Sequence, residues 1–173
     1  MSIIACVARP EKMNNAHFLE KLKRLLLRNP YSYFVWCGRE EQEASNTFQK
    51  NLLRLEISSR SFFAGWVHPW HVIKESDYFL DTYPFGSGIT LAQAMRLGKT
   101  ILLHQQELPH KNETSLLEDF LIREPNFSSI IQSAQIYPKH RIITLQNDDT
   151  DCYNLNYQAI SDQQMHGETI SDI

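Results

Sequence analysis

The stretch from Tyr78 to Leu103, YFLDTYPFGSGITLAQAMRLGKTILL, restricts the fold of this chain more than any other part of the sequence. The apolar run over 78–80 is typical of a buried strand, and the segment 84–88 cannot continue it because it is rich in proline and glycine. Apolar residues at helical spacing over 90–97 predict a helix, which Gly98 ends. An Ile-Leu-Leu run then returns to the sheet. The stretch therefore predicts a strand, a loop, a helix and a second strand in direct succession.

The glycine loop in the middle of this stretch suits an anion. The backbone N–H groups of Gly86, Ser87 and Gly88 have no partner within the helix that follows, and the helix dipole places partial positive charge beside them. A phosphate binds readily at such a place. A turn whose glycines serve only backbone geometry explains the loop equally well, because a single Gly-x-Gly spacing is a weak signal.

Strand-like and helix-like runs alternate through the first hundred residues. The predicted strands are 3–8, 33–37, 61–66, 77–80 and 101–103. The predicted helices are the segment from Asn15 to Asn29, 41–55, 70–76 and 90–97. The connections are long enough for right-handed crossovers between parallel strands. The pattern predicts an α/β protein with a Rossmann-like, doubly wound parallel sheet.

The periodicity is weaker after His104. Further predictions are helices at 115–122 and 130–136 and a last strand at 141–145. Polar and acidic residues dominate from Gln146 onward. We therefore expect residues 1–145 to form one Rossmann-like domain and residues 146–173 to form a polar, loosely ordered tail. The apolar residues of this tail that can pack back onto the domain are Tyr153, Leu155 and Tyr157.

Composition limits the number of domains and the kinds of partner. A chain of 173 residues that is 42% hydrophobic can bury one core, and its formal charge of -3 provides no overall field for nucleic acid or an anionic membrane. No apolar run approaches the roughly 18 residues of a membrane span, and no basic segment typical of a secretory signal follows Met1. Cys6 and Cys37 lie in apolar runs, and with Cys152 the number is odd, which favours a reducing compartment. We expect a cytoplasmic protein.

Motifs for nucleophilic or metal chemistry are absent from the sequence. It contains no G-x-S-x-G, P-loop, H-E-x-x-H or C-x-x-C pattern. His68 and His71 are three residues apart, but a metal would need further ligands at fixed places. Asp149 and Asp151 form an Asp-x-Asp pair in the polar tail, where a solvated acidic turn is the simpler interpretation. We expect no metal and no cofactor, and the sequence identifies no catalytic residue.

The loops that follow the strands fall on one edge of the predicted sheet, where ligands of doubly wound proteins bind. Arg9 and Lys12 follow the first strand, and their cationic side chains can meet a diphosphate beside the glycine loop. Ordinary solvated charges are the alternative. Trp66, His68 and Trp70 place aromatic surface after the third strand, on which a base can stack. The alternative is that Trp66 belongs to the core and Trp70 covers a helix end.

With these pieces in this order, the sequence resembles the carboxyl-terminal, donor-binding half of glycosyltransferases of the GT-B fold. The resemblance runs from about Ile3 to Leu103. It is carried by RPEKMN after the first strand, by NPYSYFVWCG, by R-x-x-F-x-G-W at 60–66 and by LDTYPFGSGIT. The last motif looks most like the O-linked N-acetylglucosamine transferases and the bacterial cytoplasmic enzymes that glucosylate asparagine. The resemblance implies a single GT-B half-domain.

The resemblance also implies roles for individual residues. The diphosphate of a nucleotide-sugar would be bound by Arg9, Lys12, Gly86, Ser87, Gly88 and Thr90. The base and ribose would be bound by Val67, His68, His71 and Gln93. These families usually carry a carboxylate where this chain has Gln93, and an amide can bind two hydroxyls without contributing charge. Retaining members place a glutamate where this chain has Phe85, which favours an inverting or a degenerate site.

The implied function is binding of a nucleotide-diphosphate sugar, such as a UDP-sugar, for glycosyl transfer. GT-B enzymes close two domains over their substrates, and the amino-terminal domain commonly supplies acceptor contacts and a catalytic base. We therefore expect a partner domain or subunit that carries the acceptor site. The first alternative is a non-catalytic nucleotide-binding or assembly module derived from a glycosyltransferase. The second is an unrelated protein of the response-regulator or flavodoxin kind, which the absence of an acidic pair or a Ser/Thr-rich loop after the first strand disfavours.

Overall fold

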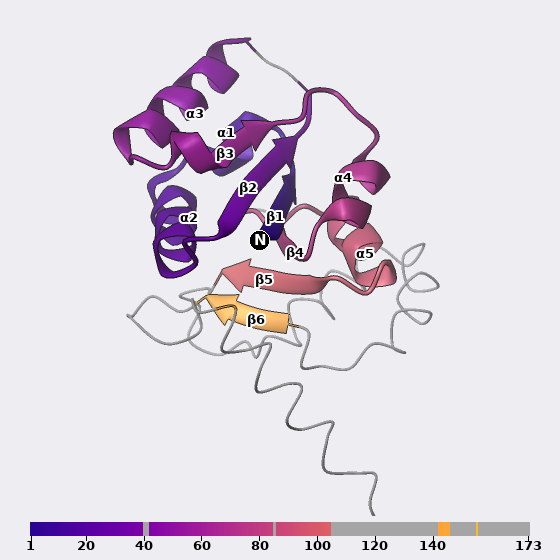
Figure 1. The fold of residues 1–173 in the computed structure, drawn as a ribbon. Coiled ribbons are helices and arrows are strands. Elements are labelled where there is room, and N and C mark those ends of the chain that lie inside the picture. The colour runs from indigo at the N-terminus through magenta and orange to yellow at the C-terminus, as the bar shows by residue number, and fades with distance from the viewer. Residues whose placement is uncertain (40–41, 85, 105–141, 146–154, 156–173) are drawn as a thin grey trace, which may run out of the picture.

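The computed structural model of the chain describes residues 1–39, 42–84, 86–104, 142–145 and 155. In this part of the chain a six-stranded sheet has the order β3-β2-β1-β4-β5-β6, and every neighbouring pair is parallel. Helices α2 and α3 lie on one side of the sheet, and α4 and α5 lie on the other (Figure 1). The predicted doubly wound α/β architecture is confirmed.

The elements follow one another as strand and helix along most of the described chain. The strands are β1 (Ser2–Val7), β2 (Ser32–Cys37), β3 (Ser61–Phe63), β4 (Tyr78–Leu80), β5 (Thr100–His104) and β6 (Ile142–Leu145). The helices are α1 (Pro10–Met13), α2 (Ala16–Arg28), α3 (Gln42–Arg54), α4 (Pro69–Glu75) and α5 (Ile89–Arg96), with a 3-10 turn η1 (Ser58–Arg60). No helix in these described ranges is long and apolar enough to cross a membrane.

Two local predictions were wrong. The segment after β1 was expected to be a loop, but Pro10 begins the one-turn helix α1, since a proline suits the first position of a helix. The third strand was expected to reach Trp66 but ends at Phe63. Ala64 still donates to the carbonyl of Trp36 at 2.8 Å, after which Gly65 at a φ of 82° turns the chain away from the sheet.

The strand order changes direction between β1 and β4. From β1 the chain first moves outward through β2 to β3, and it then returns to place β4 on the other side of β1 (Figure 1). The register pairs Ile4 with Tyr78 and Ala5 with Phe79, so the two strands end within one residue of each other. The region between the loops that leave β1 and β4, here termed the crevice, is the usual ligand position in a doubly wound sheet.

A hydrophobic core covers each face of the sheet. On the α2 and α3 side it includes Phe18, Trp36 and Phe48, and on the α4 and α5 side it includes Ile73 and Phe79. The apolar residues at helical spacing in α5 face this second core: Leu91 and Ala94 are buried in it, and Met95 and Leu97 are partly buried against it. Both sides of the sheet are thus fixed by apolar packing, which leaves its carboxyl edge for polar loops.

Cys6 and Cys37 are buried, one in each core, as predicted. Burial raises the pKa of the Cys37 thiol to about 11 and that of Cys6 well above its ordinary value. Both side chains are therefore neutral at physiological pH and act as small hydrophobic groups.

Both ends of helix α2 are held by side chains. At its start, Asn15 Oδ1 accepts from the Phe18 N–H at 2.9 Å, as expected of a capping residue. At its end, the Arg60 guanidinium donates to the carbonyls of Leu26, Asn29 and Pro30 at 2.7, 3.1 and 3.3 Å. Arg60 thus fastens the end of α2 to the start of β3.

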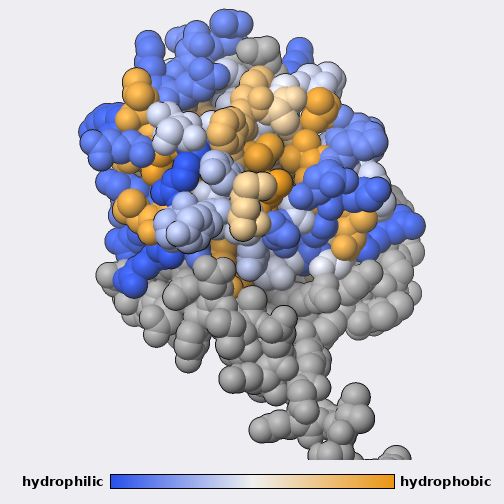
Figure 2. Space-filling view, in the orientation of Figure 1, coloured by the Kyte–Doolittle hydropathy of each residue, from blue (hydrophilic) through white to orange (hydrophobic). Residues whose placement is uncertain are grey.

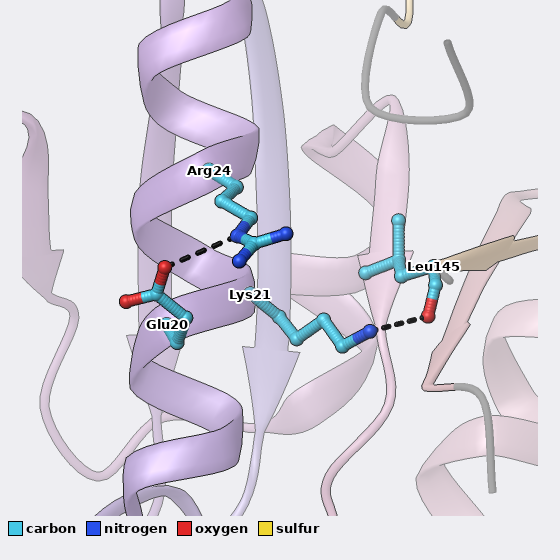
Figure 3. Close-up of polar contacts among 4 residues, drawn as sticks. All are labelled: Glu20, Lys21, Arg24 and Leu145. Carbon is cyan, nitrogen blue, oxygen red and sulfur yellow. Dashed lines mark hydrogen bonds and ion pairs between the residues drawn. The ribbon is translucent and has the colours of Figure 1, made fainter. Parts of the chain in front are cut away.

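A buried lysine joins α2 to the far edge of the sheet (Figure 3). Lys21 is 4% exposed, and its Nζ donates to the carbonyl oxygen of Leu145 at 2.8 Å. On the same helix, Arg24 forms an ion pair with Glu20 at 3.1 Å (Figure 3). The bond from Lys21 ties β6, which lies late in the sequence, to the amino-terminal part of the chain.

The predicted strand at 141–145 is confirmed as β6, and Leu155 packs back onto the domain as predicted. Its N–H donates to Asn29 Oδ1 at 3.0 Å, and its side chain is 1% exposed. The helices predicted at 115–122 and 130–136, and Tyr153 and Tyr157, lie outside the described residues. The predicted boundary between domain and tail stays a prediction.

Candidate functional site

The loops after β1 and β4 contact each other at the crevice. Lys12, in α1, donates from Nζ to the carbonyl oxygen of Gly86 at 3.1 Å. Thr90 Oγ1, in the first turn of α5, lies 3.3 Å from the carbonyl oxygen of Val7 and 3.1 Å from that of Ser87. The side chain of Lys12, the turn at residues 86–88 (the glycine turn) and the start of α5 are therefore brought together, as the sequence predicts.

Asp81 is the anchor of the glycine turn. It follows β4 directly and is 8% exposed, and its Oδ1 accepts from the Ser87 N–H at 2.7 Å. A Cβ on Gly86 would lie 3.0 Å from Asp81 Oδ2, so the turn packs tightly on the carboxyl group. The hydroxyls of Thr82 and Ser87 lie 3.4 Å apart beside this contact. The buried carboxyl group of Asp81 thus fixes the shape of the turn through its contacts with Ser87 and Gly86.

The prediction that three N–H groups of the turn are free needs one correction. The Ser87 N–H is engaged by Asp81, because the carboxyl group lies under the turn. Gly88, at a φ of 58°, precedes α5. The predicted N–H groups of Gly86 and Gly88, and that of Ile89, have no hydrogen-bond partner in the described part of the chain. The Gly88 and Ile89 amides lie next to the positive end of the helix dipole and remain available to an anion.

The electrostatic environment of Asp81 is mixed. Burial raises the pKa of its carboxyl group, while hydrogen bonds from Ser87 and Thr82 and the charge of Lys12 act in the opposite direction. The balance favours the neutral form more than in a solvent-exposed aspartate. A buried acid in this position is sensitive to any charge that enters the crevice.

His104 ends β5 and supports the same region. Its Nε2 lies 2.9 Å from the Asp81 carbonyl oxygen, so this nitrogen carries the proton and donates it. Burial lowers the pKa of His104 to about 3, and the ring is neutral. It packs against the rings of Phe18, His17 and Tyr83, with centroids 5.4 to 5.8 Å away. His104 therefore fixes the backbone from which the Asp81 carboxyl group projects.

Asp81 and His104 were missed by the sequence reasoning. Both stand at the carboxyl end of a predicted strand, the position from which Arg9 and Lys12 were selected. The same criterion applied to every strand end would have found them.

The other predicted diphosphate ligand, Arg9, is exposed at the position before α1. No contact between its side chain and the glycine turn occurs among the described residues. Lys12 alone of the two is placed at the turn by a hydrogen bond. The role of Arg9 stays a prediction.

The predicted base loop lies between β3 and α4. Val67, His68 and His71 are exposed, and His68 Nδ1 accepts from the Trp70 N–H at 3.3 Å, which caps α4. Trp66 is 76% exposed and so does not belong to the core. Within the described ranges no hydrogen bond joins this loop to Lys12 or to the glycine turn.

Gln93, the predicted ribose ligand, lies one turn into α5. Its Oε1 is inaccessible to solvent and has no hydrogen-bond partner in the part of the chain that the structure describes. A buried acceptor without a donor costs about 1–3 kcal/mol. Gln93 thus has an unused acceptor on the helix that starts at the glycine turn.

The described residues contain no metal-binding group, and a pocket among them lies away from this crevice. The described segments contain no group of three or more His, Cys, Asp or Glu side chains that could hold a metal ion. A pocket of about 470 Å³ lies between α3 and β3, with Trp36, Leu52 and Phe63 in its wall. None of its lining residues belongs to the loops around Lys12. Figure 2 shows hydrophobic residues at the surface over β2 and β3, where Phe62 is half exposed.

No family model and no curated protein matches the sequence. Solved structures do match the fold. A mutant of the O-GlcNAc transferase from Thermobaculum terrenum superposes with a TM-score of 0.58 and 14% identity, over 97% of this chain and 32% of that protein. WaaG, a glycosyltransferase involved in lipopolysaccharide biosynthesis, gives 0.53 and 16%, over 92% of this chain and 46% of WaaG.

The Anabaena protein Alr3699/HepE, solved in complex with UDP and glucose, gives a TM-score of 0.50 and 17% identity. The match covers 94% of this chain and 48% of HepE, so the chain spans about a third to a half of the length of these three structures. At these identities the comparison establishes architecture. The chain has the fold of a single half-domain of a GT-B glycosyltransferase.

Proposed function

We propose that this chain is the donor-binding part of a glycosyltransferase, and that it binds a nucleotide-diphosphate sugar, such as a UDP-sugar, in the crevice between β1 and β4. The observation that carries the proposal is the meeting of Lys12 with the glycine turn, where the Gly88 and Ile89 N–H groups lack partners in the described chain. An ammonium group and two amides at a helix start form a set of donors that matches a diphosphate.

The proposed chemistry is electrostatic. As the bond between the sugar and the diphosphate breaks, negative charge builds on the departing phosphate oxygens. Lys12, the amides before α5 and the helix dipole stabilise that charge without moving, because the Asp81 and Thr90 contacts already fix the turn. Arg9, at the position before α1, adds a second positive charge. No catalytic base is assigned.

The remaining contacts follow from the loops around the crevice. We assign Gln93 to the ribose: its Oε1 lacks a donor in the described chain, and it can accept from a sugar hydroxyl if the side chain turns out of its buried position when the ligand binds. Val67 and His68, in the loop after β3, and His71, in α4, are assigned to the base. Transfer requires an acceptor site, which we assign to a second domain or subunit, since the chain spans a third to a half of the structures it matches.

Isothermal titration of the full chain with UDP tests the binding site. We expect Lys12→Ala to weaken binding about tenfold or more, which corresponds to the loss of one charge-assisted hydrogen bond. Arg9→Ala weakens binding less, because the Arg9 side chain has no described contact with the turn. Lys50→Ala, on the exposed face of α3, is the matched control and leaves affinity unchanged. Equal binding by wild type, Lys12→Ala and Arg9→Ala removes the proposed role of the two cations.

A non-catalytic nucleotide-binding module is the second candidate, and Gln93 favours it. An amide in place of a carboxylate grips the ribose without charge and so more weakly. Transfer and hydrolysis assays with a panel of UDP-sugars, with and without an acceptor-domain partner, separate the two candidates. Turnover with the partner supports the glycosyltransferase, and UDP binding without any turnover supports the module.

A further inference from the structure

The Asp81 carboxyl group contacts the same turn at which the proposed function places the diphosphate. Its Oδ1 holds the Ser87 N–H at 2.7 Å, one residue before the two amides that remain available. A phosphate oxygen that accepted from the Gly88 N–H at an ordinary hydrogen-bond distance would lie within about 9 Å of this carboxyl group. A buried carboxylate and a diphosphate would then share one small set of donors.

Three titratable groups face Asp81 in the described part of the chain. Lys12, from α1, is cationic and lowers the pKa of the Asp81 carboxyl group. The Cys6 thiol, from β1, is buried and neutral. The neutral ring of His104, from β5, donates to the Asp81 backbone carbonyl and gives no charge to the side chain. Lys12 is therefore the cation that acts on the Asp81 carboxylate and that is also proposed to bind the ligand.

We propose that Asp81 takes up one proton from solvent when a nucleotide diphosphate binds at the glycine turn, so that Lys12 and the amides of the turn act on the ligand alone. This inference rests on the proposed function of the site. The protonated carboxyl group still has a carbonyl oxygen that accepts from the Ser87 N–H, and its hydroxyl becomes a donor that can face a phosphate oxygen. The turn therefore keeps its shape while the repulsion between two anions is removed.

The direction of the effect follows from the contacts. In the free protein, burial raises the pKa of Asp81, and the bonds from Ser87 together with the charge of Lys12 limit the rise. A diphosphate adds negative charge nearby and competes for those donors, and both changes raise the pKa further. Between the pKa values of the free and bound states, binding takes up a proton, and affinity falls as pH rises, by up to about tenfold per pH unit.

UDP-glucose is the probe for the test, because both of its phosphates are esterified and neither titrates near neutral pH. Titration calorimetry of the full chain in two buffers of different ionisation enthalpy, between about pH 5.5 and pH 8, counts the protons taken up. We expect uptake by the wild type and none by Asp81→Asn, which keeps an acceptor oxygen for the Ser87 N–H. The affinity of Asp81→Asn then changes less than about twofold across this range.

Asp77→Asn is the matched control. The Asp77 carboxylate also accepts from a backbone N–H, that of Ile3 at 2.8 Å, but it lies at the amino ends of the strands, away from the glycine turn. This variant keeps the proton uptake of the wild type.

The outcomes separate the two levels of the proposal. UDP-glucose binding without proton uptake by the wild type overturns the role of Asp81 and leaves the binding site intact. Equal uptake by the wild type and by Asp81→Asn does the same, as does a folded Asp81→Asn that no longer binds. If the wild type does not bind UDP-glucose at any pH, the proposed function fails together with the inference. The wild-type proton count alone decides the matter if Asp81→Asn does not fold.

Discussion

Burial affects the two ionisable residues under the glycine turn in opposite directions. It raises the pKa of Asp81 and lowers that of His104, so each is driven toward its neutral form. For His104 the lowered pKa affects the stability of the fold as well as the geometry of the site. The neutral ring donates to the Asp81 backbone, and a second proton on the ring would place a positive charge among Phe18, Tyr83 and His17.

We predict that His104 makes the protein sensitive to mild acid. Its pKa of about 3 in the folded state lies below the ordinary value of 6.5, so its contribution is complete above pH 6.5 and is lost as pH falls toward 3. The slope is up to about 1.4 kcal/mol per pH unit for one proton. His104→Gln keeps an N–H donor for Asp81 and does not titrate. Urea denaturation at a series of pH values should show a flatter decline for this variant than for the wild type.

His71→Gln, at an exposed position of α4, is the control and should retain the wild-type slope. If His104→Gln loses stability with acid as steeply as the wild type, another group is responsible for the decline.

At the scale of single elements, α2 depends on a side chain from outside the helix. The three carbonyls that Arg60 binds belong to the end of α2 and to the turn that follows, where no intrahelical N–H reaches them. Arg60 itself leads into β3, so one guanidinium joins a helix end to an edge strand. A single nitrogen of the guanidinium, Nη1, makes all three contacts.

We predict that Arg60→Ala lowers the free energy of unfolding by about 1–3 kcal/mol, because carbonyls that are partly buried lose a charged donor. Arg60→Lys recovers part of the loss, since its ammonium group keeps the charge but sits on a shorter, more flexible side chain than the planar guanidinium. Chemical denaturation followed by circular dichroism measures both effects. Arg54→Ala, on the exposed end of α3, should change stability by less than about 0.5 kcal/mol. An equal effect of Arg60→Ala and Arg54→Ala would contradict the capping role.

The helices and strands also show how much of the fold and of the site could be predicted from the sequence. Apolar residues at helical spacing were sufficient to predict α2, α3 and α5, because each of these helices buries one continuous face. The one-turn helix α1 is too short for any period, and β3 was extended too far because Gly65 is a turn signal that the apolar residues around it obscured. Lys12 was predicted at the glycine turn because strand ends of a parallel sheet share one edge. The capture of the Ser87 N–H depends on a side-chain position that no sequence pattern encodes.

The whole molecule is organised about β1. This strand pairs with β2 on one side and β4 on the other, and its residues belong to both cores. The crevice of the proposed site opens where those two pairings diverge. Folding of the sheet and formation of the site therefore depend on the same strand.

The central place of β1 has a consequence for synthesis of the protein. Strand β1 (residues 2–7) is synthesised before the other strands of the sheet, and β2 at 32–37 can pair with it early. The other edge of β1 has no partner until β4, which ends at Leu80, has been made. Until β4 has left the ribosome, the nascent chain exposes an apolar strand with unpaired amides and carbonyls, so a chaperone is most needed during this interval.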